Sequence, residues 1–581
     1  MNKKIQFSYI TAILLLGFLV FSSFGLEWNP KKDYPQDYFR SPVNTAILLS
    51  GTFGELRPNH LHSGIDIKAH KGKTGQPILA AADGYVARIK IQSGGYGNVL
   101  YVNHPNGYTT VYAHLGSLPK EIDTYVKKAQ YRKKKFEIEL FPKAGTFKFT
   151  KGQKIGTLGM SGRSYGPHLH FEIRDTKTEK PINPLLFGLK STDKVAPKLH
   201  ELKVYYLNDK RESLETKTHK LIKGKRNYRI KGDTLYIPAW RAGFGLKVYD
   251  HMTGTPNWNG IYSLEMLQDD EPAYSFEMET FAFRESRYIN AHLDYGEQVS
   301  KKSYFNRCYS LPGNRLSVYN NVKEKGVITL HKNKASKITM IAKDIAGNNR
   351  KLEFWVKRAE VKSFDKAPYN YLLPYEEENI IDNDALYAYF PKGTFYENLY
   401  LQYRSSTEKS SNVYSAVQHV HDYETPVHKY YDLAIRPTNL PDHLRDKAFI
   451  AYCQPNEKVI SCGGEWKDGR LQTKVRDLGD FYIMVDETPP TIKPDKFQTN
   501  MKGYSRMTFK IKDNFETARN IEYLDYRATV DGQWILMTYD AKNDLLTHRF
   551  DDKIKAGTHQ FKLVVTDSRG NEKVFEREFK R

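Results

Sequence analysis

Short apolar runs separated by Gly, Asn or Pro recur along residues 40–190. Three of them are ILAAADGYVARIKI (78–91), GNVLYVNH (97–104) and TTVYAHL (109–115). Runs of this length, bounded by turn-forming residues, predict antiparallel strands joined by tight turns. No long segment shows a period of 3.6 residues. Only the polar, lysine-rich insertion at 119–150 predicts a helix, a short one near 121–130.

The pattern changes after about residue 188. Two stretches, 338–357 and 561–580, share an apolar strand, a D-x-x-G-N turn and a second strand, which predicts a hairpin in each. Each stretch closes a unit that opens near a proline, at VAPKL (195–199) and TPPTI (488–492). Strands with turn signals every 8–12 residues predict β-sandwiches of the immunoglobulin-like kind.

The chain is therefore predicted to be mainly β: a compact antiparallel β-sheet domain followed by about three β-sandwich modules. Its 581 residues suit three or four domains at roughly 150 residues each. The predicted division is a signal peptide at 1–25, a compact domain at 26–190 with the insertion 119–150, a sandwich at 191–360, an all-β module at 361–485 and an immunoglobulin-like sandwich at 486–581.

The first 25 residues have the features of a secretory signal peptide. Lys3 and Lys4 precede an apolar run from Ile10 to Val20, and the small residues Ser23 and Gly25 follow it. The alternative is an uncleaved anchor helix, but the apolar run is short for a bilayer. We expect cleavage and export to the periplasm, the cell envelope or the medium, with no membrane span in the mature chain.

Export determines how the formal charge of +22 is interpreted. Outside the cytoplasm nucleic acid is not the expected partner, and anionic envelope polymer or a membrane surface takes its place. The densest basic run is KKAQYRKKK, Lys127 to Lys135. It is interpreted either as a polymer-binding patch or as a solvated face of a helix or loop.

Three cysteines are too few for a disulfide scaffold. Cys453 and Cys462 bracket a short segment that a disulfide bond would close in an oxidising compartment, and Cys308 is left over. None has the spacing of a zinc site, so all three are predicted to be structural.

The histidines carry the candidate chemistry. His168 and His170 flank one leucine in an extended run, so their imidazoles share a face. Upstream, His62 and Asp66 flank a Ser-Gly turn, and Asp66 lies between two isoleucines in a segment that is otherwise apolar, where a carboxylate needs a cationic partner. Taken singly, Asp66 is as well explained by a turn cap and His114 by a solvated strand position.

Such spacings are weak evidence alone, because the chain has 18 histidines. His60-Leu61-His62 repeats the H-x-H pattern. His419-Val-His421 repeats it again, and His428 with Asp432 repeats the H-x-x-x-D spacing. The set at 419–432 has no glycine nearby and its order is reversed, so we expect it to bind no metal.

The strings HSGIDI, AAADGYV, GYGNVLYVNH, YAHL and GRSYGPHLHFEIRD occur in this order over about 150 residues, roughly 40–190. Together they resemble the lysostaphin/LytM-type zinc metalloendopeptidases. The resemblance implies an antiparallel β fold with a narrow groove over one zinc ion. It also implies substrates among the cross-links and stem peptides of bacterial peptidoglycan.

The resemblance assigns the candidate residues by position. It makes His62, Asp66 and His170 the zinc ligands, and His114 and His168 the two catalytic histidines that do not bind the metal. Two imidazoles and one carboxylate suit zinc and leave a position open for water, whose pKa the ion lowers towards about 7. A neighbouring imidazole can accept the water's proton and a second can stabilise the oxyanion. We assign the base to His168 with His114 in support, although the sequence does not order the two roles. Some members carry a tyrosine upstream of the first ligand, where this chain has Phe53.

Three classes of function follow. The first is an active zinc endopeptidase on peptidoglycan peptides, which the five intact positions favour. The second is a non-catalytic regulator of other wall enzymes with the same fold. The third is a structural or adhesive envelope protein that acts through its β-modules, which occupy about 390 residues beyond the compact domain.

Overall fold

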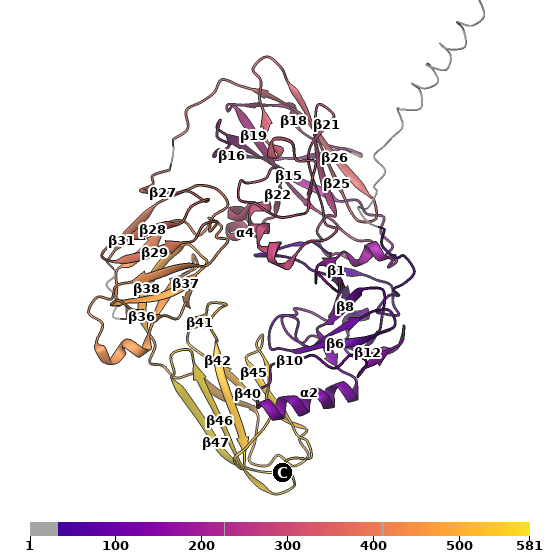
Figure 1. The fold of residues 1–581 in the computed structure, drawn as a ribbon, viewed down its shortest axis with the longest axis vertical. Coiled ribbons are helices and arrows are strands. Elements are labelled where there is room, and N and C mark those ends of the chain that lie inside the picture. Colours follow the sequence, from indigo (N-terminus) through magenta and orange to yellow (C-terminus); the bar gives the residue numbers. More distant parts are fainter. Residues whose placement is uncertain (1–32, 226, 366, 408–411) are drawn as a thin grey trace, which may run out of the picture.

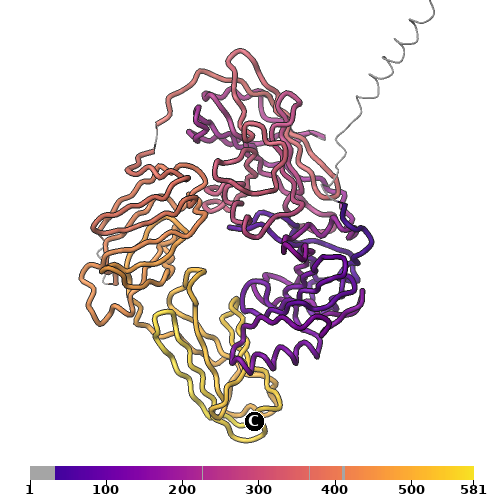
Figure 2. The backbone as a smooth tube through the Cα atoms, in the orientation of Figure 1, coloured from indigo at the N-terminus to yellow at the C-terminus, as the bar shows by residue number. Residues whose placement is uncertain are grey.

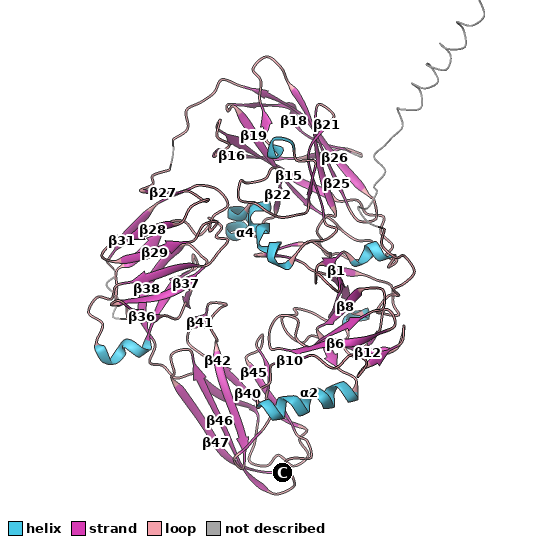
Figure 3. Ribbon diagram, in the orientation of Figure 1, coloured by secondary structure: helices cyan, strands magenta, loops and turns pink. Residues whose placement is uncertain are grey.

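The computed structural model describes residues 33–581 except 226, 366 and 408–411, and it is built almost entirely of strands (Figure 3). The predicted mainly β class is therefore confirmed. The signal peptide predicted at 1–25 lies outside the described residues. Within the described part of the chain, no helix has both the length and the apolar character that crossing a membrane requires.

Four units follow one another around a ring (Figures 1 and 2). We call them the N-terminal domain (33–190), the first sandwich (191–360), the middle module (361–485) and the last sandwich (486–581). The ring brings the last sandwich beside the N-terminal domain, although the two are farthest apart in sequence.

The N-terminal domain is organised around a mixed-length antiparallel sheet. Along the sheet the main strands lie in the order β1 (Leu49–Gly51), β4 (Ile65–Lys68), β13 (His168–Asp175), β8 (Tyr108–Ala113), β7 (Val99–Asn103), β6 (Gly84–Ile91) and β10 (Ile138–Leu140). At its margins β11 (Lys148–Phe149) pairs with β6 and β14 (Pro181–Ile182) with β13. Two smaller sheets complete the domain: β2 (Leu56–Arg57) with β3 (His60–Leu61), and β5 (Pro77–Leu79), β12 (Lys154–Leu158) and β9 (Leu115–Ser117).

The insertion forms the one long helix among the described residues, α2 (Lys120–Lys133), which confirms the predicted helix and extends it at both ends. Ile122, Val126 and Ala129 are buried along one side at the spacing of an amphipathic helix. The basic residues of the predicted patch occupy the end of this helix and the turn after it.

The first sandwich packs two sheets face to face. One orders β16 (Ser213–Lys220), β15 (Lys198–Leu207), β19 (Arg241–Tyr249) and β22 (Phe305–Arg307). The other runs mainly through β18 (Asn227–Ile237), β26 (Asn349–Arg358), β25 (Ser336–Lys343), β20 (Ser263–Gln268) and β21 (Glu271–Glu277). Two short helices, α3 (Ile289–His292) and α4 (Tyr295–Lys301), lie between this unit and the middle module (Figure 1).

The other two units are also two-sheet packings. In the middle module the main strands are β28 (Asn379–Asp382), β29 (Leu386–Phe390), β33 (Tyr431–Ile435) and β37 (Arg470–Val475) against β32 (Val417–Val420), β38 (Gly479–Val485) and β34 (Ala448–Cys453). In the last sandwich β39 (Thr491–Lys496), β40 (Arg506–Lys512) and β45 (Leu545–Arg549) face β42 (Leu524–Val530), β46 (Thr558–Asp567) and β47 (Glu572–Lys580). That any of these units is immunoglobulin-like stays a prediction.

The buried side chains do not separate into one core per unit. A single cluster of buried apolar residues runs from Tyr34 through the N-terminal domain to Val356 of the first sandwich, whereas the middle module and the last sandwich have their own cores. At the junction Phe53 packs on Phe281, with ring centroids 5.2 Å apart. The N-terminal domain and the first sandwich are thus held together by apolar burial, the largest favourable term in folding.

The spacing of Cys453 and Cys462 does not lead to a disulfide bond. Their hairpin places Val459 opposite Cys453, and Cys462 lies three positions further along the chain. Cys308 and Cys462 are buried, as structural thiols usually are.

Candidate metal centre

The sheet register brings the predicted ligands together. Asp66 on β4 lies directly opposite His170 on β13, and His168 is two residues earlier on the same strand, so its side chain leaves from the same face. His62 follows the short strand β3 and reaches the site across the turn through Ser63 and Gly64. A side chain at Gly64 has no room, because a Cβ there would lie 2.4 Å from the carbonyl oxygen of Phe171.

Three acceptor atoms converge at this point. Asp66 Oδ1 lies 3.1 Å from His62 Nε2 and 2.9 Å from His170 Nδ1, and the two nitrogens are 3.0 Å apart. All three residues are buried. Ligands that bind one zinc ion at about 2.0–2.2 Å have separations close to these.

The outer nitrogens of the two ligand imidazoles show that the inner ones carry lone pairs. His62 Nδ1 is 2.7 Å from the carbonyl oxygen of Thr52, and His170 Nε2 is 2.8 Å from Glu172 Oε1. A carbonyl or carboxylate oxygen only accepts, so these ring nitrogens donate and the inner nitrogens are bare in the neutral ring. Two bare nitrogens and a carboxylate oxygen facing one another need a proton or a metal ion between them.

The charges around the centre favour a cation there. Burial alone would lower the pKa of His170, but the hydrogen bonds to Asp66 and Glu172 raise the pKa to about 9. Although burial opposes it, the pKa of Asp66 is held well below its usual range by His62 and His170. The donor set of two imidazoles and one carboxylate, with one negative charge, therefore fits zinc.

Asp66 and Glu172 are themselves anchored by arginines. Arg57 donates to the second carboxylate oxygen of Asp66 at 2.6 Å, which leaves Oδ1 directed at the histidines. Arg174 donates to Oε2 of Glu172 at 2.5 Å, while Oε1 also accepts from Ser63 and Tyr96. Both oxygens of Glu172 and Oδ2 of Asp66 thus have a donor, as buried charges require, and Oδ1 of Asp66 is left for the metal ion. The ring of Tyr96 stacks on that of His170 with centroids 5.0 Å apart.

The two remaining histidines are oriented in the same manner. His114 Nδ1 donates to the carbonyl oxygen of Ser161 at 2.8 Å, and His168 Nδ1 donates to that of Gly166 at 2.8 Å. Their ring centroids are 4.8 Å apart, and His168 Nε2 lies 3.5 Å from Asp66 Oδ1. Both residues therefore present a bare Nε2, and that of His168 faces the metal ligands.

Both imidazoles are neutral at neutral pH. Burial, reinforced by His170 and His168, lowers the pKa of His114 to about 3, and burial also lowers the pKa of His168. His114 has a left-handed backbone with φ of 59°, a conformation that histidine rarely adopts and that functional sites retain at an energetic cost.

The loop at 159–166 holds both of these imidazoles through the carbonyl oxygens of Ser161 and Gly166. The same loop is hydrogen-bonded to the last sandwich, because Lys542 Nζ donates to the carbonyl oxygens of Met160 and Ser164 at 2.8 and 2.9 Å. Nearby, Tyr131 of α2 donates to Asp551 at 3.2 Å and its ring meets Trp534 edge-on at 5.3 Å. The insertion thus contacts the last sandwich.

The other histidine set does not converge. Among the described residues, the groups with metal-binding geometry include His62, Asp66 and His170 but none of His419, His421, His428 and Asp432. His419 lies between Asp480, at 2.6 Å from Nδ1, and Ser406, at 2.7 Å from Nε2. Phe53 is 2% exposed in the core at the domain junction and takes no part in the site.

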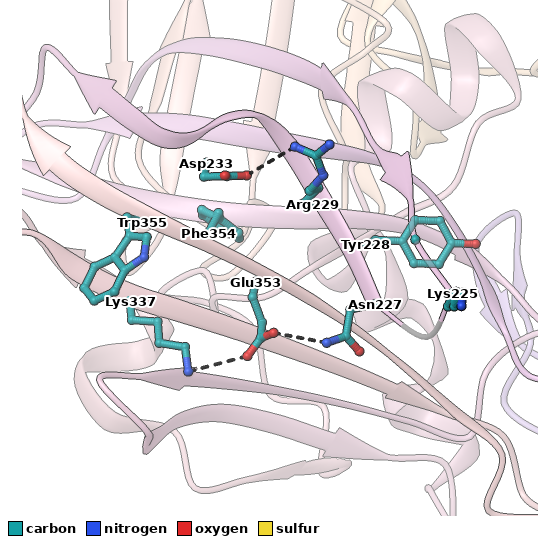
Figure 4. A pocket seen from close by; sticks show the side chains of 10 residues that line it. Lys225, Asn227, Tyr228, Arg229, Asp233, Lys337, Glu353, Phe354 and Trp355 are labelled. Carbon is teal, nitrogen blue, oxygen red and sulfur yellow. Dashed lines mark hydrogen bonds and ion pairs between the residues drawn. The ribbon is translucent and has the colours of Figure 1, made fainter.

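An open hollow on the first sandwich offers a contrast (Figure 4). Most of its charged side chains are paired with one another or with a polar neighbour: Lys337 and Asn227 both contact Glu353, and Arg229 pairs with Asp233. The described residues that line it include no histidine or cysteine, so they offer zinc no imidazole or thiolate ligand.

Comparison with known proteins agrees with this geometry. Residues 60–131 and 146–184 match Peptidase family M23, and residues 370–486 match the Zu5-like domain. The chain is 35% identical over 129 residues to the DD-carboxypeptidase/endopeptidase Mpg of Neisseria meningitidis, a match that covers 22% of this chain and 23% of that protein. It is 30% identical to the peptidoglycan DD-endopeptidase ShyC of Vibrio cholerae, over 31% of this chain and 36% of that protein.

A third relative is named as an activator and not as a peptidase. The murein hydrolase activator NlpD of Escherichia coli is 35% identical over 153 residues, which are 26% of this chain and 32% of NlpD. The chain thus spans between about a fifth and a third of the length of these curated relatives. Among solved structures, the catalytic domain of lysostaphin from Staphylococcus simulans aligns at 21% identity over 24% of this chain and 91% of that one, with a TM-score of 0.19. The matched residues and the motifs they contain confirm the resemblance drawn from the sequence: residues 60–184 are a LytM-type domain of peptidase family M23.

Proposed function

We propose that this chain is an exported zinc endopeptidase that hydrolyses the peptide cross-links or stem peptides of bacterial peptidoglycan. The observation that carries the proposal is the convergence of five side chains: three acceptors at 2.9–3.1 Å from one another, and two neutral imidazoles beside them. A merely structural metal site would be closed by a fourth protein ligand. Here the three ligands leave a position beside His168.

His62, Asp66 and His170 would hold the ion, and when bound it would polarise the scissile carbonyl and acidify a water molecule. His168 Nε2, bare and directed at the ligands, accepts the proton of the attacking water. His114 lies beside it and presents a second bare Nε2, which can share this proton and can donate to the charge on the carbonyl oxygen only while it holds that proton. When the carbonyl carbon–nitrogen bond breaks, the proton held by His168 passes to the leaving amine.

The two carbonyl groups of the loop at 159–166 keep these imidazoles ready. Because Ser161 and Gly166 each accept a proton from Nδ1, the Nε2 lone pair of each ring is fixed towards the site before substrate arrives. Positioning of this kind lowers the barrier without any rearrangement during the reaction.

The names of the relatives support cell-wall peptides as the substrate class, and they are compatible with two different activities. Mpg and ShyC are titled endopeptidases, whereas NlpD is titled a hydrolase activator. The intact set of five residues favours hydrolysis by this chain itself. As possible partners we retain anionic envelope polymers, through the basic end of α2.

The test is product analysis with the secreted chain, residues 26–581, on purified peptidoglycan. Mass spectrometry of the released fragments should show new peptide termini, with D-alanyl cross-links to a diamino acid as the expected bond, and no cut glycan. His114→Ala should retain its metal and release much less. If the chain releases nothing alone but accelerates a second wall hydrolase, the activator is the correct description. The full chain is used because the core of residues 33–190 continues into the first sandwich.

A further inference from the structure

Two further clusters of metal-ligating side chains lie outside the catalytic domain, at the junctions that precede the first and the last sandwich. The first cluster is Asp193, Asp250 and Asp344, and the second is Asp486, Asp513 and Asp567. In each, one carboxylate oxygen per residue lies within 4.8 Å of the other two. Five of the six residues are at least nine-tenths buried, and Asp193 is half-buried.

The two clusters occupy the same three positions of their sandwiches. The first aspartate, Asp193 or Asp486, lies on the segment that enters the sandwich, a few residues before a proline. The second, Asp250 or Asp513, directly follows the strand that pairs with the first strand. Sequences that differ elsewhere thus place three carboxylates at the same end of both units.

The third aspartate, Asp344 or Asp567, begins the D-x-x-G-N turn of the closing hairpin. Asn348 Nδ2 donates to Asp344 Oδ2 at 2.8 Å and to the carbonyl oxygen of Asp193 at 3.3 Å. In the last sandwich, Asn571 Nδ2 repeats both bonds, to Asp567 Oδ2 at 2.7 Å and to the carbonyl oxygen of Asp486 at 2.9 Å. The side chains of Asp193 and Asp486 accept from the backbone N–H two residues further on. Turn formation therefore accounts for the first and third aspartates.

Turn formation does not account for the second aspartate. Oδ1 of Asp250 and Oδ1 of Asp513 are buried without any hydrogen-bond donor. Asn259, which pairs with Asp250 across an isolated bridge and is 1% exposed, also has an amide oxygen and nitrogen without partners. In such a pair the two side chains leave from the same face.

In the described part of the chain no ion pair compensates these charges, and only the second cluster has cations, Arg569 and Lys447, close enough to act on it electrostatically. Among the ion pairs of the described residues, none involves any of the six aspartates. An uncompensated buried carboxylate is costly, and three together are more so. Burial, with Asp344 and Asp193 close by, raises the pKa of Asp250 to about 8.

We propose that each of the two clusters binds a calcium ion that fixes the entry to its sandwich. The ligands are all oxygens, which hard cations prefer, and oxygens up to about 4.8 Å apart can share one ion at the Ca²⁺–O distance of about 2.4 Å. Carboxylates from three separate segments suit the irregular geometry that calcium accepts, whereas magnesium demands a near-ideal octahedron.

The positions of the clusters give the ions a structural role. One ion joins the N-terminal domain's connecting segment to the first sandwich, and the other joins the middle module's connecting segment to the last sandwich. The second ion would thereby fix the orientation of the unit whose Lys542 grips the loop at 159–166.

Calcium titration of the secreted chain, residues 26–581, tests the proposal. Isothermal calorimetry would use protein freed of divalent ions on a chelating resin, in a His170→Ala background so that the zinc centre does not contribute. We expect two Ca²⁺ per chain with dissociation constants below about 1 mM, the range of extracellular calcium modules. Asp250→Asn and Asp513→Asn should each bind one, the double variant none, and the exposed control Asp209→Asn two.

Thermal unfolding gives a second readout. Calcium should raise the unfolding midpoint of the parent chain and leave the double variant unchanged. In calcium-free buffer the double variant should unfold no earlier than its parent, because it has lost like charges that repel. Three results would overturn the proposal: no binding at about 10 mM Ca²⁺, tighter binding of Mg²⁺ than of Ca²⁺, or two ions still bound by the double variant. If a variant fails to fold, the number of ions bound by the parent chain still decides the question.

Discussion

The candidate zinc centre and the two aspartate clusters are built on the same principle and differ in what surrounds them. Both bring three ligands from separate strands or turns into a buried point. The zinc centre has two nitrogens, one carboxylate and two further imidazoles whose bare nitrogens flank it. Each aspartate cluster has three carboxylates, and hydrogen bonds that hold only turns and connecting segments. The ligand atoms determine which metal ion a site prefers. The groups around the ligands determine whether the site is suited to catalysis or to stabilising the structure.

Loss of a zinc ligand should have the largest effect. His170→Ala removes one of three ligands, so zinc content should fall close to zero and release of wall fragments should fall to background. Elemental analysis and fragment release measure the two quantities. His419→Ala is the matched control, because it alters the other H-x-H pair and should retain both. Equal losses in the two variants would point to general damage.

Loss of a flanking imidazole should separate chemistry from metal binding. His168→Ala should keep its zinc and lose about 10²- to 10⁴-fold in turnover, the usual contribution of a general base. If zinc is lost with activity, His168 is a ligand, and the distinction drawn between the flanking and the ligand imidazoles fails.

The pH dependence of hydrolysis should show the lowered pKa values of the flanking imidazoles. A base with the ordinary pKa of about 6.5 would lose about two thirds of its neutral form between pH 7 and pH 6. Burial lowers the pKa of His168, and that of His114 to about 3, so the neutral forms persist and activity at pH 6 should stay close to that at pH 7. A threefold fall over this interval would contradict the assignment.

The smallest expected effect concerns the aspartate clusters. Added calcium should raise the unfolding midpoint of the wild-type and His170→Ala chains by the same few degrees, because the clusters do not depend on the zinc centre. A calcium shift that disappears with His170 would show that the ion acts at the catalytic domain.

Much of the candidate site was readable in the sequence, because each residue lies within a short motif. The structure brings His62, Asp66, His114, His168 and His170 together, and the roles that the resemblance assigns to them stay predictions. Glu172 and Arg174 were missed, although they continue the alternation of His168 and His170 on one strand face. Two charged residues at that spacing in a buried strand were the signal.

Other features depend on contacts between segments that are separated in the sequence. A local sequence pattern does not predict such contacts. Arg57 meets Asp66 from the separate small sheet of β2 and β3, and Lys542 reaches its loop across 378 residues of sequence. The D-x-x-G-N repeat predicted two hairpins correctly, since its turn is local. The sequence did not show that the aspartate of each turn belongs to a three-aspartate cluster. That became visible only when the structure placed the segments that enter the two sandwiches.

The most direct test of the account is to measure zinc content and hydrolysis in one preparation of the wild-type secreted chain, before and after chelation and after zinc is restored. The account predicts one zinc ion per chain, fragment release that stops when zinc is removed, and recovery when it is returned. A chain that binds no zinc, or that cleaves equally well without it, would contradict the central claim.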